Sequence, residues 1–136
     1  MMARDTKNFK VSEFDCKNCT CGGLNGVKQK TIDCAQKIRD YIGKPMTITS
    51  GFRCDDKQAY LRKTNPNAAK GRSAHQDGLA FDFVISGMTA KDIGAKIKKM
   101  YQEGKLNELE YSYLITSTAV HVGVDHKPNR WRKFAY

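Results

Sequence analysis

Two histidines and one aspartate are the residues of this chain whose side chains and sequence context are suited to metal binding and catalysis. His75 and Asp82 lie in the stretch GRSAHQDGLAFDF, which spans residues 71–83, and His121 lies in the stretch VHVGVD further along the chain. Two imidazoles and one carboxylate are a normal set of protein ligands for a catalytic zinc ion that keeps one position open. Such an ion lowers the pKa of its water to about 7 and polarises a carbonyl oxygen. The three residues are therefore a candidate metal site for hydrolysis.

Asp82 and His121 are each expected on a β-strand that has one apolar and one polar face. From residue 79 onward large apolar residues alternate with small or polar ones, and three valines alternate around His121 in the same way. Because successive side chains of a strand point to opposite faces, both metal-capable side chains project away from the apolar face. Their neighbours on the polar face are alanine and glycine, which leaves space above the sheet for an ion, a water and a substrate. Gly78 makes the bend between His75 and the first of these strands sterically easy.

The rest of the chain predicts three helices and two further strands that position these residues. Apolar residues at helical intervals, together with capping residues, glycines and prolines, delimit helices over residues 27–43, 55–64 and 89–104. The further strands cover residues 45–52 and 108–116, and the second of them pairs with residues 119–125 as an antiparallel hairpin. Because helices and strands are interspersed and the pairing is mostly antiparallel, the expected class is α+β, with about three helices packed around the sheet.

Length and composition favour a single small domain over residues 1–136. A chain of 136 residues with 40% hydrophobic residues is long enough to form its own core. Within this domain, residues 1–26 form a cysteine-containing N-terminal segment and residues 127–136 form a basic C-terminal tail.

The net charge of +10, from 24 lysines and arginines against 14 acidic residues, predicts attraction to polyanions. No helix-turn-helix, zinc-finger or single-strand stacking signature accompanies the charge, so an anionic envelope surface is the expected partner rather than nucleic acid. Solubility alone is the other interpretation. The sequence has no run of about 18 apolar residues and no apolar core of a secretory signal near its start. We therefore expect no membrane insertion, and synthesis in the cytoplasm.

Three of the five cysteines, Cys16, Cys19 and Cys21, lie close together in the sequence. An odd number of cysteines in a chain without a signal argues against a secreted disulfide framework. The spacing of the three is compatible with a structural zinc ion, for which Cys34 or Cys54 would be the fourth ligand. Cys34 lies close to the apolar stripe of the first predicted helix, where a cysteine behaves as a small hydrophobic residue. Plain reduced thiols are the other interpretation of the cluster.

The stretch SAHQDGLAFD resembles the Ser-x-His-x-x-Gly-x-Ala-x-Asp signature of the zinc D-alanyl-D-alanine carboxypeptidase family, which also includes phage L-alanyl-D-glutamate endolysins. TSGFR resembles the Ser-Gly-[Tyr/Phe]-Arg turn of that family, and VHVGVD resembles its final strand with the third ligand. FKVSEFDC and the helix before MTITSGFR resemble the beginning of these domains, so the resemblance covers nearly the whole chain.

This resemblance implies an α+β peptidase domain with one zinc ion held by His75, Asp82 and His121, and a murein stem peptide as substrate. It implies that Arg53 contacts the substrate and helps to hold developing negative charge, two tasks that suit a planar and permanently charged guanidinium. It also implies that Ser73 lies near the metal, where its hydroxyl would orient a ligand or the substrate.

Hydrolysis by this route also needs a carboxylate that takes the proton of the water and passes it to the leaving amine. Family members commonly place an acid shortly before the third ligand, where this chain has Thr118, and many have an acid at position 123, where it has glycine. Glu110 and Asp125 are the preferred candidates for this role, with Asp77 behind them.

The register of the predicted hairpin bears on these candidates. If the turn has two residues, Leu114 lies opposite His121 and Glu110 shares its sheet face, whereas a three-residue loop would put tyrosines there. Asp125 shares that face as well, but at about 3.3 Å per residue it lies roughly 13 Å from His121 along the strand.

The expected function is that of a zinc-dependent peptidoglycan peptidase of the endolysin type, which hydrolyses an amide bond of the murein stem peptide. L-Alanyl-D-glutamate and D-alanyl-D-alanine bonds are not separated by the sequence, since the three-ligand site serves both. Such a protein would be made in the cytoplasm as a monomer, and it would act in the periplasm or cell wall of the host after release. The alternative, which the missing acid motivates, is a non-catalytic cell-wall or virion binding module whose zinc ion stabilises the fold.

Overall fold

One antiparallel sheet carries the candidate site, in a computed structural model that describes residues 3–64, 73–107 and 111–124. The strand order is β1-β2-β4-β3, and each neighbouring pair is antiparallel. The strands are β1 (Thr47–Ser50), β2 (Ala80–Val84), β3 (Tyr111–Ile115) and β4 (Val120–Val124). The helices of the described residues are α1 (Gln29–Ile42), α2 (Asp55–Thr64) and α3 (Ala90–Gln102), with short 3-10 helices η1 (Val11–Phe14) and η2 (Ala74–Asp77). The predicted α+β class is therefore confirmed.

The helices begin and end close to the local signals that predict them. α1 ends at Gly43, whose φ of 76° lies in the left-handed region and whose N–H donates to the carbonyl of Arg39. α3 begins after Thr89, whose hydroxyl accepts the N–H of Asp92 at 3.1 Å. Both contacts satisfy backbone groups that a helix end leaves without an intrahelical partner. β1 is shorter than the strand predicted over 45–52, because the chain turns after Ser50 into the loop that leads to α2.

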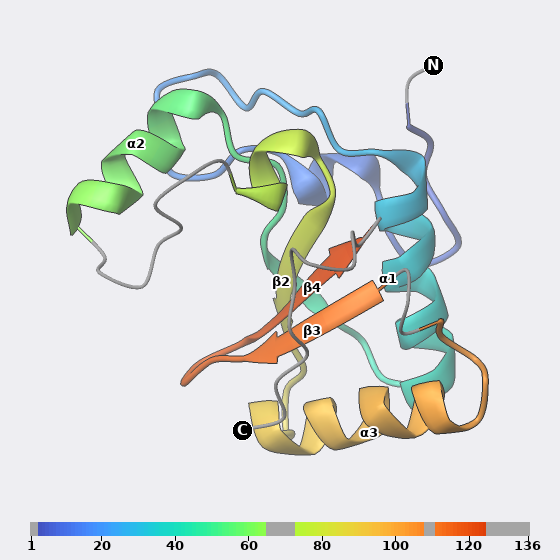
Figure 1. The fold of residues 1–136 in the computed structure, drawn as a ribbon. Coiled ribbons are helices and arrows are strands. Elements are labelled where there is room, and N and C mark those ends of the chain that lie inside the picture. The colour runs from blue at the N-terminus through green and yellow to red at the C-terminus, as the bar shows by residue number, and fades with distance from the viewer. Residues whose placement is uncertain (1–2, 65–72, 108–110, 125–136) are drawn as a thin grey trace.

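α1 and α3 cover the apolar face of the sheet, and α2 lies apart from both of them (Figure 1). The buried side chains between the sheet and these two helices include Phe81, Phe83, Val120 and Val122 from the strands and Ile32, Ile38, Ile93 and Ile97 from the helices. Burying one such side chain stabilises the fold by about 1.5–3 kcal/mol. The opposite face of β2 and β4 carries the partly exposed Asp82 and His121. The core thus holds the two strands in place and leaves their polar face for the site.

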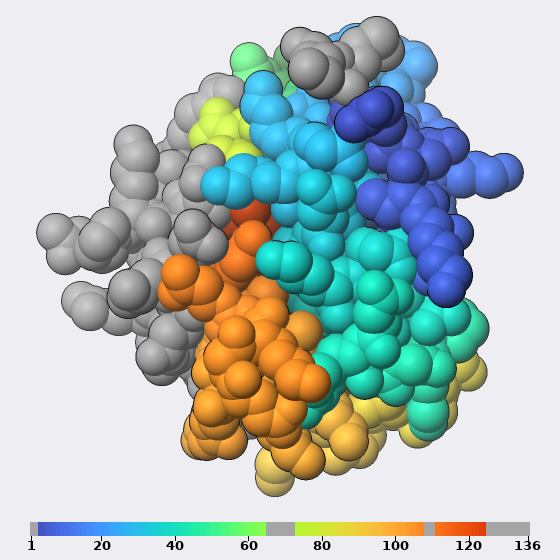
Figure 2. Space-filling view, turned by 90° about the vertical axis from the view of Figure 1, so that its right-hand side faces the viewer, coloured from blue at the N-terminus to red at the C-terminus, as the bar shows by residue number. Residues whose placement is uncertain are grey.

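The N-terminal segment lies along α1, where two glutamines hold it. Gln29 Oε1 accepts the N–H of Arg4 at 2.6 Å, and Gln36 Oε1 accepts the hydroxyl of Thr6 and the N–H of Asn8, each at 2.8 Å. Figure 2 shows this segment, in blue, beside the surface of α1. The segment is therefore part of the folded structure. None of the described helices has the length and the apolar stretch that a membrane crossing requires.

Candidate active site

The antiparallel pairing of β2 with β4 places Asp82 directly opposite His121. Opposite residues of an antiparallel pair share a sheet face, and their Cβ atoms lie about 5 Å apart. On the other edge of β4, Leu114 of β3 lies opposite His121. This register confirms the two-residue turn of the hairpin, and the N–H of Thr116 donates to the carbonyl of Ala119 across it at 2.9 Å.

His75 reaches the same place from η2, a single helical turn that two residues delimit. The hydroxyl of Ser73 accepts the N–H of His75 at 3.2 Å and so caps the start of η2. Gly78 ends η2 with a φ of 72°, and its carbonyl accepts the hydroxyl of Thr31 at 2.7 Å. A Cβ atom on Gly78 would lie 2.0 Å from the carbonyl oxygen of Gly26. The position therefore requires glycine twice, once for its backbone conformation and once for the close approach of the neighbouring chain.

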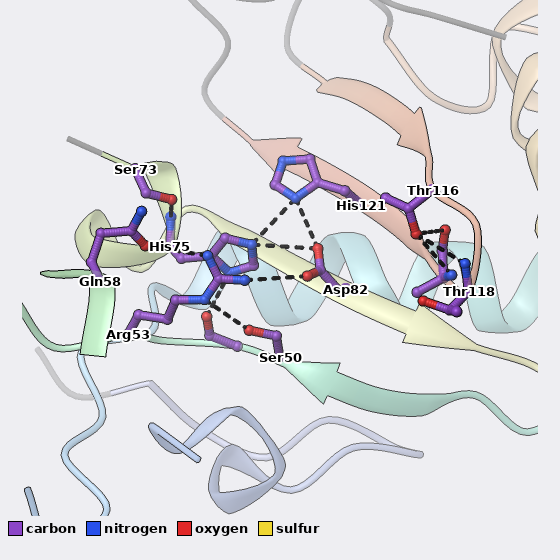
Figure 3. Close-up of polar contacts among 11 residues, drawn as sticks. Ser50, Arg53, Gln58, Ser73, His75, Asp82, Thr116, Thr118 and His121 are labelled. Carbon is purple, nitrogen blue, oxygen red and sulfur yellow. Dashed lines mark hydrogen bonds and ion pairs between the residues drawn. The ribbon is translucent and has the colours of Figure 1, made fainter. Parts of the chain in front are cut away.

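Three donor atoms from these segments converge on one point (Figure 3). Oδ1 of Asp82 lies 2.8 Å from Nδ1 of His121 and 3.3 Å from Nε2 of His75. The two imidazole nitrogens lie 3.2 Å apart. Ligands at about 2.0–2.1 Å from a tetrahedral zinc ion are about 3.3 Å from one another. The observed separations therefore fit three ligands of one ion of this size.

The orientation of His75 is set by the main chain. Its Nδ1 lies 2.7 Å from the carbonyl oxygen of Gly51, which can only accept a hydrogen bond. Nδ1 therefore carries the proton, and Nε2 presents its lone pair to the converging donors. Burial lowers the pKa of His75 below its usual value, although the neighbouring carboxylate of Asp82 opposes this effect. The neutral, metal-binding form of the imidazole is thus the favoured one.

The carboxylate of Asp82 is held in its charged form. Burial acts to raise its pKa, but the two histidines beside it outweigh burial, so the pKa lies well below the usual value. A permanently charged carboxylate beside two imidazoles is a suitable donor set for a divalent cation.

Arg53 lies beside the converging donors, as its predicted role requires. Its guanidinium is 3.4 Å from Oδ2 of Asp82 and donates to the hydroxyl of Ser50 at 3.2 Å and to Oε1 of Gln58 at 3.3 Å. Burial lowers the pKa of Arg53, and the charge of Asp82 opposes this effect. Gln58 is fully buried in α2. Sequence reasoning missed this glutamine, because one polar residue in a helix of which half the residues are charged carries no signal.

Of the three residues predicted to carry the proton, the structure describes only Asp77. Glu110 and Asp125 lie outside the described residues. Asp77 lies in η2, two residues after His75. The assignment of the general base therefore stays a prediction.

A comparison with known protein families identifies the chain. The model of the peptidase M15 family matches residues 7–123. The chain belongs to the peptidase M15 family. The matched residues include every described residue of the candidate site in this M15 peptidase.

Comparison with solved structures agrees with the fold of this M15 peptidase. The L-Ala D-Glu endopeptidase ChiX of Serratia marcescens is similar with a TM-score of 0.53 and 17% sequence identity, over 73% of this chain and 80% of that one. At this identity the likeness concerns the fold alone. No curated protein sequence matches the chain.

Four of the cysteines in this M15 peptidase form a second cluster. The sulfur atoms of Cys16, Cys19, Cys21 and Cys54 all lie within 4.8 Å of one another. Cys34 is fully buried in α1 and belongs to the hydrophobic core. Of the two alternatives for the fourth cysteine, the structure therefore brings Cys54 to the cluster.

The thiols of this cluster differ in their acidity. Burial raises the pKa of Cys16 to about 12. The backbone N–H of Leu24 lowers the pKa of Cys21 to about 7, because a hydrogen bond to sulfur favours the thiolate.

Proposed function

We propose that this M15 peptidase is a zinc-dependent enzyme that hydrolyses an amide bond of the peptidoglycan stem peptide. The observation that carries the proposal is the convergence of His75, Asp82 and His121, whose donor atoms lie between 2.8 and 3.3 Å from one another. Membership of a peptidase family supports the reaction type, and the similarity in fold to an L-Ala D-Glu endopeptidase supports the substrate class.

The three residues would hold the zinc ion through Nε2 of His75, Oδ1 of Asp82 and Nδ1 of His121. Zinc supplies Lewis acidity and an activated water nucleophile at such sites. The carbonyl of Gly51 keeps the His75 ring in the tautomer that offers Nε2. Ser73 acts as a positioning residue, since its hydroxyl accepts the N–H of His75 and so fixes the turn that presents the imidazole.

Arg53 would bind the substrate and stabilise negative charge that develops on its carbonyl oxygen. A guanidinium is planar and stays charged, so it can do both without a proton transfer. Ser50, Gln58 and Asp82 surround its nitrogen atoms and hold it beside the site. A preorganised donor of this kind contributes about 100-fold to 1000-fold to kcat in other enzymes.

A carboxylate is still needed to accept a proton from the water and to return it to the leaving amine. Glu110 and Asp125 remain our first candidates, with Asp77 as the third. Substitution of each by its amide, with kcat measured as a function of pH, identifies the residue, because the base accounts for the acidic limb of the profile.

The similar ChiX fold favours cleavage of the L-alanyl-D-glutamate bond, with D-alanyl-D-alanine as the alternative. The enzyme would act as an endolysin that is made in the cytoplasm and reaches the cell wall after release. The net charge of +10 would then help it to bind an anionic envelope.

The experiment is mass spectrometry of purified peptidoglycan after incubation with the protein, with and without a chelator. We expect new stem-peptide fragments whose masses identify the bond, and we expect none with chelator or with the His75→Ala variant. Protein that pellets with peptidoglycan but releases no fragments would overturn the proposal in favour of a non-catalytic wall-binding module.

A further inference from the structure

The four-cysteine cluster has the geometry of a tetrahedral metal site. Its sulfur atoms lie within 4.8 Å of one another, with 3.8 Å between Cys16 and Cys54 and 3.5 Å between Cys19 and Cys54. Four sulfurs at about 2.3 Å from a tetrahedral zinc ion are about 3.8 Å from one another. We propose that Cys16, Cys19, Cys21 and Cys54 bind a structural zinc ion that is distinct from the catalytic one.

The local backbone is shaped to bring the sulfurs together. Asn18, between the first two cysteines, has a φ of 54°, and Gly22 and Gly23 after the third have φ values of 79° and 77°. These left-handed residues turn the chain tightly, so that cysteines close in sequence can face one point. The segment between η1 and α1 has no regular secondary structure, and a metal ion would supply the ordering that it lacks.

N–H groups and one lysine around the cluster are placed to balance the negative charge that four metal-bound thiolates would carry. The N–H of Cys54 donates to the sulfur of Cys16 at 3.5 Å, and the N–H of Lys57 donates to the sulfur of Cys54 at 3.4 Å. The second of these bonds comes from the first turn of α2, where the helix dipole stabilises negative charge. Nζ of Lys57 donates to the carbonyl of Asn18 within the cysteine loop at 3.2 Å. A zinc ion with four thiolates carries about two negative charges, so a lysine beside it is favourable.

Disulfide bonds account less well for the arrangement. Cys54 is near Cys16 and Cys19 at the same time, whereas a disulfide joins one pair and excludes the other. Four sulfurs that are mutually close are expected around one ion, while two disulfides require two separated pairs.

The proposed ion would fasten two segments that hold the candidate active site. Cys54 follows Arg53 directly, and the N–H of Phe52 donates to the carbonyl of Phe14 at 2.8 Å. A Cβ atom on Gly51 would lie 2.6 Å from Cα of Phe14, so the two backbones are in close contact. The ion would lock this contact and thereby fix the carbonyl that orients His75. The effect of the ion on the candidate active site rests on the proposed function, whereas the cysteine metal site itself does not.

The first test is the zinc content of the full chain, purified without chelator and measured by elemental mass spectrometry. We expect about two zinc ions per chain in the wild type, and about one in Cys19→Ser and in the double variant His75→Ala/His121→Ala. Cys34→Ala is the matched control, because it removes a buried thiol outside the cluster, and it should keep the wild-type content.

Cobalt in place of zinc gives a second readout that does not depend on activity. Thiolate ligands produce sulfur-to-cobalt charge-transfer absorption in the near ultraviolet, and imidazole and carboxylate ligands do not. We expect this absorption in the histidine double variant and not in Cys19→Ser. If Cys19→Ser does not fold, the spectrum of the histidine variant decides alone.

A histidine double variant that binds no metal and lacks this absorption would overturn the cysteine site. Disulfides among the four cysteines of freshly purified wild-type protein would overturn it as well. Wild-type protein that shows the absorption but releases no peptidoglycan fragments would instead contradict the proposed function and leave the cysteine site standing.

Discussion

The backbone carbonyl of Gly51 lies 2.7 Å from Nδ1 of His75. The loop after β1 thus orients a side chain that comes from η2, and the two segments are joined again by the N–H of Arg53, which donates to the carbonyl of His75 at 3.1 Å. Because one short loop supplies both this carbonyl and the guanidinium beside Asp82, changes in that loop should affect ligand geometry and substrate contact together.

Replacing Asp82 with asparagine should remove the catalytic zinc ion and the hydrolytic activity. The amide keeps the shape of the side chain but loses the negative charge that faces His75 and His121 at 3.3 and 2.8 Å. We expect zinc affinity at this site to fall more than about 100-fold, since even the outer partners of metal ligands contribute 10-fold to 100-fold. Zinc content and fragment release measure the effect. Asp92→Asn, on the exposed start of α3, is the control, and equal losses in both variants would contradict the assignment.

Replacing Gly78 with alanine should destabilise the fold by more than about 3 kcal/mol, because a strained backbone conformation and a clash act together. The new Cβ atom would lie 2.0 Å from the carbonyl of Gly26, on a residue whose φ is 72°. Gly87→Ala isolates the conformational part, because Gly87 has a φ of 83° and a Cβ atom there would meet no other atom within 4 Å. For this control we expect about 1–2 kcal/mol. Urea denaturation compares the two, and similar free energies of unfolding would argue against the clash.

Replacing Arg53 with lysine should lower kcat/KM about 10-fold to 100-fold and leave zinc content unchanged. A single ammonium cannot reproduce the guanidinium contacts with Ser50, Gln58 and Asp82. Arg62→Lys provides the comparison, because it makes the same change at an exposed position of α2. If Arg53→Lys hydrolyses peptidoglycan at the wild-type rate, the proposed substrate contact is wrong.

Acidification should destabilise the metal-free protein. Burial lowers the pKa of His75 from 6.5, and the two histidines, against the effect of burial, lower that of Asp82 from 3.8. For each group, the unfolded state binds more protons than the folded state between the two pKa values, so the free energy of unfolding falls as the pH falls. The decline is expected to begin near pH 6.5, with His75, and to steepen below pH 3.8, with Asp82.

Urea denaturation of chelator-treated protein over this pH range measures the decline. A His75→Gln variant should lack its first part, because glutamine does not titrate. Wild-type stability that stays constant from neutral pH down to about pH 4.5 would contradict the expected coupling between protonation and folding.

Local signals in the sequence were sufficient to predict the helices and strands and the types of residue that form the site. The end of α1 at Gly43 and the cap of α3 at Thr89 each depend on contacts within four residues. The alternation around Asp82 and His121 likewise predicts which side chains point away from the apolar face, because the two-residue period of a strand depends only on its local backbone geometry. The α+β class followed from the order of these elements.

Tertiary structure decided which distant groups meet. Sequence spacing left Cys34 and Cys54 open, and only the packing of the loop after β1 against residues 14–16 brings Cys54 to the cluster. The carbonyl of Gly51 could not be foreseen as the partner of His75, because every residue carries a carbonyl and sequence does not say where it points. Contacts of this kind join segments more than twenty residues apart, so they depend on the three-dimensional path of the whole chain and not on any local preference.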